Sequence, residues 1–138
     1  MSEIDAARWR ECFGEGDPFL SWDFLHGLEA SGCTTTESGW QPAHLSIELS
    51  GEPAGMMPTY LKTHSYGEYV FDWSWADAWQ RMGLQYYPKL VTAVPFTPAT
   101  GQRLGHVDHQ SVRAPGIVEA VKGLTDSLGV SSWHVLLL

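Results

Sequence analysis

Five residues between positions 62 and 72 carry side chains that could do chemistry: Lys62, His64, Tyr66, Glu68 and Asp72. Glu68 or His64 could act as a general base, because both side chains accept protons when their surroundings adjust their pKa. Lys62 could hold a carboxylate or a phosphate, and Tyr66 could contact the same substrate. We therefore expect a ligand site with Glu68 and His64 as its catalytic residues. In the plainer alternative, Lys62 and Glu68 pair at the surface and Asp72 only caps a helix.

A second group of polar aromatic residues follows in the next expected loop. Tyr87 and Lys89, with Tyr86 beside them, could line the same cleft and bind substrate. The alternative is ordinary aromatic packing under a loop. Trp75 and Trp79 are spaced for one face of a helix, which favours a place in the core.

The whole stretch 58–101 mixes aromatic rings with ionisable groups. A segment that only fills a core would use Leu, Ile and Val without interleaving charge. Rings beside polar groups are typical of a recognition surface or a pocket wall. The rest of the chain is therefore expected to position this stretch.

Three motifs in this stretch resemble a known family. YLKTHSYGEYVFDWSWADAW, then YYPKL, then AVPFTPATG are similar to the first part of bacterial FemAB-like proteins of the GNAT acyltransferase superfamily. The resemblance runs from about Phe24 to the C-terminus. It implies a GNAT-like fold, transfer of an acyl or aminoacyl group to an amine, and a peptidoglycan precursor as substrate. It also implies an acyl donor such as acetyl-CoA, or aminoacyl-tRNA, and a longer protein with two GNAT-like domains.

The superfamily's phosphate cradle is an Arg/Gln-x-x-Gly-x-Gly/Ala loop, and residues 102–107 match it in part. Arg103 and Gly105 are the candidate cofactor-binding residues, but Val107 stands at the second glycine position. The alternative is an ordinary connecting loop. Because FemAB-like enzymes use aminoacyl-tRNA, an incomplete cradle does not exclude acyl transfer.

Neither the histidines nor the cysteines form a convincing metal or nucleophile motif. His106, Asp108 and His109 cannot all point inward on one strand, and a complete site needs about three or four ligands. We expect a polar loop here and no metal. Cys12 and Cys33 lack metal spacing and a His–Asp constellation, so we expect reduced thiols.

Composition indicates one folded domain over residues 1–138. The net charge of −8 and only three lysines argue against nucleic acid as a general partner. The N-terminus has no apolar segment of the signal-peptide type, and no apolar run reaches the roughly 20 residues that span a bilayer. We expect a cytoplasmic protein without a membrane span.

Hydrophobic periodicity predicts an α/β fold with a mixed sheet. Helices are expected at 2–12, 19–31, 73–82 and 115–128, and strands at 44–49, 54–62, 69–71, 90–94 and 130–138. Residues 33–42 and 95–110 are expected to be loops, and Pro58 to mark a strand edge or bulge. The last strand should be buried on both faces, as in a parallel sheet. Because nothing follows to cover it, we expect an incomplete sheet that a further domain or a partner chain completes.

Two functions fit these patterns. In the first, the chain is the N-terminal GNAT-like region of a FemAB-like transferase and does not complete the active site alone. In the second, it is a non-catalytic binding or assembly module that uses an aromatic surface and an open sheet edge.

Overall fold

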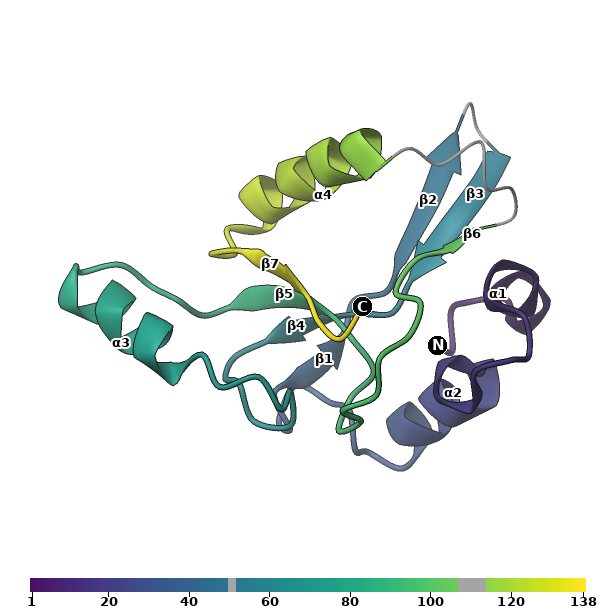
Figure 1. Ribbon diagram of the computed structural model, residues 1–138, viewed down its shortest axis with the longest axis horizontal. Helices are drawn as coiled ribbons and strands as arrows, with labels where there is room; N and C mark the ends of the chain where they lie inside the picture. The colour runs from purple at the N-terminus through teal and green to yellow at the C-terminus, as the bar shows by residue number, and fades with distance from the viewer. Residues whose placement is uncertain (50–51, 107–113) are drawn as a thin grey trace.

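The computed structural model describes residues 1–49, 52–106 and 114–138, which form two small sheets and four α-helices (Figure 1). The helices are α1 (Ala6–Phe13), α2 (Trp22–Ala30), α3 (Trp73–Arg81) and α4 (Ala114–Leu128), with a 3₁₀ turn η1 (Pro18–Leu20) before α2. The strands are β1 (Trp40–Pro42), β2 (Leu45–Leu49), β3 (Glu52–Met57), β4 (Thr59–Lys62), β5 (Lys89–Thr92), β6 (Gly105–His106) and β7 (Trp133–Val135). The expected α/β class is confirmed. The GNAT-specific topology stays a prediction.

The first sheet has the strand order β1-β4-β5-β7 and the second β2-β3-β6. All pairings are antiparallel except that of β5 with β7, so the first sheet is mixed. The single strand expected over 54–62 is wrong, because Pro58 divides it into β3 and β4, which belong to different sheets. Proline has no N–H to donate to a ladder, whereas the Pro58 carbonyl accepts from the Ala93 N–H at 3.1 Å.

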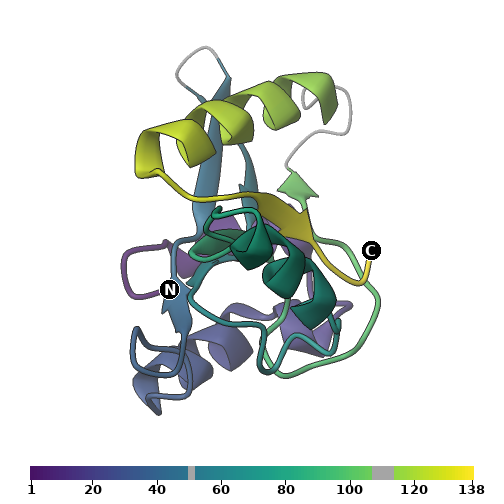
Figure 2. The same cartoon turned by 90° about the vertical axis from the view of Figure 1, so that its left-hand side faces the viewer.

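Helices α1 and α2 pack on one face of the second sheet, and α4 packs on the other. Met56 joins the core under α1 and α2, which contains the fully buried Trp9 and Leu25, whereas Met57 packs with Ile117 and Val121 of α4. Neighbouring residues of a strand point to opposite faces, which explains this division. Figure 2 shows α4 at the top of the molecule and α2 at the bottom.

The two expected N-terminal helices form, but α1 covers Ala6–Phe13 rather than 2–12 and α2 covers Trp22–Ala30 rather than 19–31. The Ser21 side chain accepts from the Phe24 N–H at the start of α2, and Gly32 follows the helix with a φ of 76°. Strand β2 also alternates as expected, with Leu45 and Ile47 half-buried and Ser46 exposed.

The region before and within α3 departs from the prediction. Residues 69–71 form a loop rather than a strand, with Tyr69 at a φ of 59° and Phe71 78% exposed. Helix α3 forms, but its aromatic stripe is not core: Trp75 is 66% and Met82 65% exposed, and no residue of α3 is buried. Figure 1 shows why, since α3 projects from the side of the first sheet, away from the other helices.

Strand β7 pairs in parallel with β5, as expected, but it lies at the edge of the first sheet and is half-buried rather than covered on both faces. The prediction of a fully buried last strand is therefore wrong. Two short strands also lie in segments expected to be loops: β1 within 33–42 and β6 within 95–110. Both are too short for a periodic pattern to reveal them.

Candidate functional site

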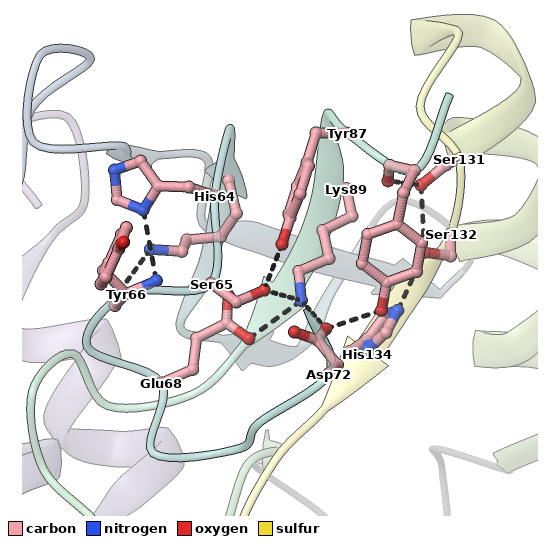
Figure 3. A network of polar contacts seen from close by, with 12 residues as sticks. His64, Ser65, Tyr66, Glu68, Asp72, Tyr87, Lys89, Ser131, Ser132 and His134 are labelled. Atoms are coloured by element: carbon pink, nitrogen blue, oxygen red, sulfur yellow. Dashed lines mark hydrogen bonds and ion pairs between the residues drawn. The ribbon is translucent and has the colours of Figure 1, made fainter. Parts of the chain in front are cut away.

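The centre of the site is Lys89, the first residue of β5. Its ammonium group lies 2.6 Å from Asp72 Oδ2, 2.9 Å from Glu68 Oε2 and 3.1 Å from Ser65 Oγ (Figure 3). Lys89 is fully buried, and Glu68 and Asp72 are 3% and 5% exposed. A buried charge needs such partners, because an unpaired one costs several kcal/mol. The alternative in which Glu68 and Lys62 pair at the surface is therefore wrong.

The loop between β4 and α3 turns these groups inward. Gly67 allows the turn with a φ of 79°, and a Cβ on it would overlap the Phe96 ring. The Phe96 N–H donates to the Gly67 carbonyl at 3.2 Å, which ties the loop to the segment after β5. Only glycine fits this combination of a left-handed φ and close packing.

Asp72 stands immediately before α3 but does not cap it with its side chain. Its carboxylate instead accepts from Lys89 and from the Tyr86 hydroxyl, both at 2.6 Å. The expected capping role is therefore wrong, because a buried cation and a phenol compete for the carboxylate. Although burial alone would raise the pKa of Asp72, these hydrogen bonds lower it to about 2.

This low pKa predicts a pH dependence of folding. A carboxylate whose pKa is lower in the folded than in the unfolded state stabilises the protein above its unfolded pKa, here 3.8, and the stabilisation is lost as pH falls towards about 2. We expect Asp72→Asn to show a shallower loss of stability than wild type between about pH 4 and pH 2. Urea unfolding at several pH values measures both slopes. Glu29, whose pKa is also about 2, titrates in both proteins and cancels, so equal slopes would contradict the prediction.

Glu68 and Lys62 are two further buried ionisable groups near Lys89. Burial raises the pKa of Glu68, against the opposing effect of the Lys89 ion pair. Lys62 is also fully buried. Its ammonium donates to the Tyr66 carbonyl at 3.1 Å and lies 3.6 Å from the centre of the Trp40 ring. Burial lowers the pKa of Lys62 to about 7. Within the described residues, Glu68 Oε1 and Asp72 Oδ1 are buried without a hydrogen-bond partner.

A cavity of about 530 Å³ lies next to the buried network and shares Ser65 and Tyr86 with it. It is bounded by the loop after β4, by α3 and by the segment before β5, through His64, Ser65, Tyr66, Trp73, Ala76, Asp77, Gln80, Leu84, Gln85, Tyr86 and Tyr87. Its lining combines four aromatic rings with one carboxylate and two amides. Such a lining suits a small ligand with both apolar and polar parts.

The structure separates the predicted site residues into two groups. His64, Tyr66 and Tyr87 line the cavity, whereas Lys62, Glu68 and Lys89 are buried behind it. The direct substrate contacts predicted for the two lysines stay predictions that this geometry does not favour. The imidazole Nδ1 of His64 lies 3.3 Å from the Tyr66 N–H, and burial and the charge of Lys62 lower the pKa of His64.

Several polar residues of the network were not predicted, namely Ser65, Ser131, Ser132 and His134. Ser65 lies between Lys89 and Tyr87, and Ser131 Oγ donates to the Tyr86 carbonyl. Ser132 precedes β7, and its Oγ lies 2.9 Å from His134 Nε2. Tyr86, which was expected beside the cleft, lines the cavity and donates to Asp72. Ser65 stands within the predicted cluster, so the sequence offered a signal for it. Residues 131–134 offered none, because only the parallel pairing of β7 with β5 brings them to Tyr86.

Arg103 and Gly105 lie away from this cavity. Arg103 is 1% exposed, and its guanidinium donates to the carbonyls of Ala99, Gln102 and Leu136. A Cβ on Gly105 would overlap the Phe13 ring, so this glycine serves close packing in β6. Binding of a cofactor phosphate by these two residues stays a prediction, and the guanidinium is already committed to the backbone.

The metal question rests partly on residues 107–113, which include Asp108 and His109 and lie outside the described residues. In the part of the chain that the structure describes, no cluster of three or more His, Cys, Asp or Glu side chains is placed to hold a metal ion. Cys12 is buried and Cys33 is exposed, and both are free thiols. No described helix combines the length and the apolar character that crossing a membrane requires.

These features define a mixed α/β protein with a buried ion-pair network behind a cavity lined by aromatic rings. A family comparison extends this description, because residues 1–138 match the FemAB-like family, described as peptidoglycan biosynthesis/recognition. The chain belongs to that family, and the expected resemblance is confirmed. No curated protein and no solved structure matches the chain.

Proposed function

We propose that the chain forms the acceptor cleft of a transferase that moves an acyl or aminoacyl group to an amine. The observation that carries the proposal is the aromatic cavity with a carboxylate at its wall and a buried, charge-paired network behind it. Membership in a peptidoglycan biosynthesis/recognition family favours an amine of a peptidoglycan precursor as the acceptor.

The cavity lining suits an ammonium group on an alkyl chain. The rings of Tyr66, Trp73 and Tyr87 offer apolar contact and negative π faces, and Asp77 offers an opposite charge. An amine must lose a proton to become a nucleophile. His64 lines the cavity, and its lowered pKa favours the neutral imidazole, whose Nδ1 accepts from the Tyr66 N–H. To take the proton of the amine, Nδ1 must exchange this hydrogen bond for one to the amine.

In the reaction, the amine nitrogen attacks the acyl carbonyl, its proton passes to His64, and the leaving oxygen or sulfur departs with the bonding electrons. Glu68 is the second candidate base. Because Glu68 is buried and does not line the cavity, it would act on the amine only through a group that does, such as Ser65. Acetyl-CoA and aminoacyl-tRNA are both proposed as donors. The open edge of β7 is where a further domain or a partner chain would complete the site.

The proposal is tested by transfer to a simple amine. Hexylamine is incubated with the protein and either acetyl-CoA or aminoacyl-tRNA, and mass spectrometry detects the N-acyl product. We expect product with one donor and a loss of about 100-fold or more in His64→Ala, but not in the control His26→Ala. Absence of product with both donors, although hexylamine binds, would contradict transfer and favour the second function.

That second function is a non-catalytic binding module, and one observation favours it. Tyr66, Phe71, Trp73 and Trp75 are 50–78% exposed on α3 and the loop before it. Exposed rings gathered in this way are typical of an interaction surface.

A further inference from the structure

We propose that the outer surface of residues 66–76, the aromatic segment, docks on a phospholipid bilayer by inserting its rings into the headgroup region. This inference goes beyond the proposed transfer and does not rest on it, because a transferase and a binding module can both work at a membrane. The evidence is an inversion of the usual arrangement of a surface loop: the charged side chains lie inside and the aromatic rings lie outside.

The aromatic segment buries both of its charged residues. Glu68 and Asp72 are 3% and 5% exposed, because their carboxylates pair with the buried Lys89. The large side chains beside them point outward instead. Their exposed fractions are 37% for Val70 and 50–78% for the rings of Tyr66, Tyr69, Phe71, Trp73 and Trp75. A chain with a net charge of −8 therefore presents an uncharged aromatic surface here.

Helix α3 extends this surface and leaves it uncovered. No residue of α3 is buried, and the helix projects from the side of the first sheet (Figure 1). Trp75 and Met82 lie two helical turns apart, so they share one face of α3, and they are 66% and 65% exposed. Apolar side chains gathered on an exposed surface in this way mark an interaction site.

The kinds of ring fit the headgroup region of a bilayer. Tryptophan and tyrosine combine an apolar body with a polar N–H or O–H, and they gather where one end is apolar and the other is wet. Within the described residues, the indole N–H groups of Trp73 and Trp75 have no protein partner and are free to donate to lipid oxygen atoms. Four other indoles donate to oxygen atoms of the protein, those of Trp9, Trp22, Trp40 and Trp133.

The charges favour a bilayer over a protein as the partner. Charged groups on two proteins fix how the proteins align, and the aromatic segment exposes none. A fluid bilayer requires no fixed alignment. Its surface is uncharged or negative, depending on its lipids, so a negative one would repel exposed carboxylates. Because the segment also lacks Lys and Arg, apolar insertion rather than ionic attraction holds the protein on the bilayer.

Docking in this way brings the candidate site to the bilayer surface. Tyr66 and Trp73 belong to the aromatic segment and also line the cavity, and their ring centres lie 5.8 Å apart. The cavity therefore adjoins the docking surface and lies near the level of the headgroups when the protein is bound.

The test measures binding of the whole chain to phosphatidylcholine vesicles by co-sedimentation. We expect wild type to bind, with no loss when the salt concentration is raised, because ionic attraction does not contribute. Phe71→Ser combined with Trp75→Ser should weaken binding about 100-fold or more, since each ring that leaves water contributes about tenfold. The matched control combines Phe19→Ser with Leu128→Ser, whose side chains are 40% and 54% exposed outside the segment, and it should bind like wild type.

A second measurement uses wild type alone, so it does not depend on how the variants fold. Bromine atoms on the lipid acyl chains quench indoles that enter the bilayer, and we expect them to quench part of the tryptophan fluorescence. Absence of vesicle binding, bound protein without quenching, or an equal loss of binding in both double variants would overturn the proposal. Wild type that ignores vesicles but self-associates through Phe71 and Trp75 in sedimentation velocity would show that a second copy of the chain covers the surface instead.

Discussion

We expect Lys89→Met to destabilise the protein by about 3–5 kcal/mol, the range for breaking a buried ion pair by removing one partner. Methionine fills a similar volume, so the loss is electrostatic rather than a cavity effect. Without the ammonium, Glu68 and Asp72 would face each other as buried carboxylates with one cation fewer. Urea unfolding of wild type and variant measures the difference, which is a large part of the 5–15 kcal/mol that holds a typical domain together.

Lys122→Met is the matched control, because Lys122 is exposed on α4. We expect it to change the free energy of unfolding by no more than about 0.5 kcal/mol. A Lys89→Met protein as stable as Lys122→Met would show that the ion-pair network does not hold the site together.

The second large effect is expected from Arg103→Met, which should destabilise the protein by about 2–4 kcal/mol. The guanidinium satisfies the carbonyls of Ala99, Gln102 and Leu136, and buried acceptors left without a donor cost about 1–3 kcal/mol each without adding fully. Leu136 directly follows β7, so the variant should also loosen β7 from the loop before β6. Urea unfolding again gives the free energy, with the exposed Arg81→Met as control.

This variant also separates the structural role of Arg103 from the predicted cofactor role. A phosphate-binding arginine would be lost with little effect on stability and with a large loss of acetyl-CoA affinity. Unchanged stability together with lost acetyl-CoA binding would therefore contradict the structural role of Arg103 and support the predicted phosphate site.

The sequence indicated the place of the candidate site because the residues of the site are close together in the chain. Lys62 ends β4, and His64, Tyr66 and Glu68 follow in the next loop. Tyr87 and Lys89 lie just before and at the start of β5, so spacing alone suggested a common cleft. Spacing could not tell which side chains face the cavity and which lie behind it. That division depends on the turn at Gly67 and on the depth of β5, whose residues are all buried.

Failures of the prediction have physical causes in tertiary structure. The spacing of Trp75, Trp79 and Met82 is typical of a buried helix face, but α3 packs beside the sheet rather than on it. Asp72 has the right place for a cap, but the buried Lys89 is a stronger partner than a backbone N–H. An arginine in a glycine-containing loop suggests a phosphate-binding site. The Arg103 guanidinium instead donates to backbone carbonyls, and the most distant of these, that of Leu136, is brought near only by the fold.

The proposed amine site is tested most directly by determining where a simple amine binds. Hexylammonium is titrated into the protein, and NMR follows the indole N–H signals of Trp73, which lines the cavity, and of Trp75, which does not. We predict a saturable shift at Trp73 with Trp75 unaffected, and weaker binding in Asp77→Asn. No saturable shift at Trp73, or an equal shift at both tryptophans, would contradict the claim that this cavity is an amine site.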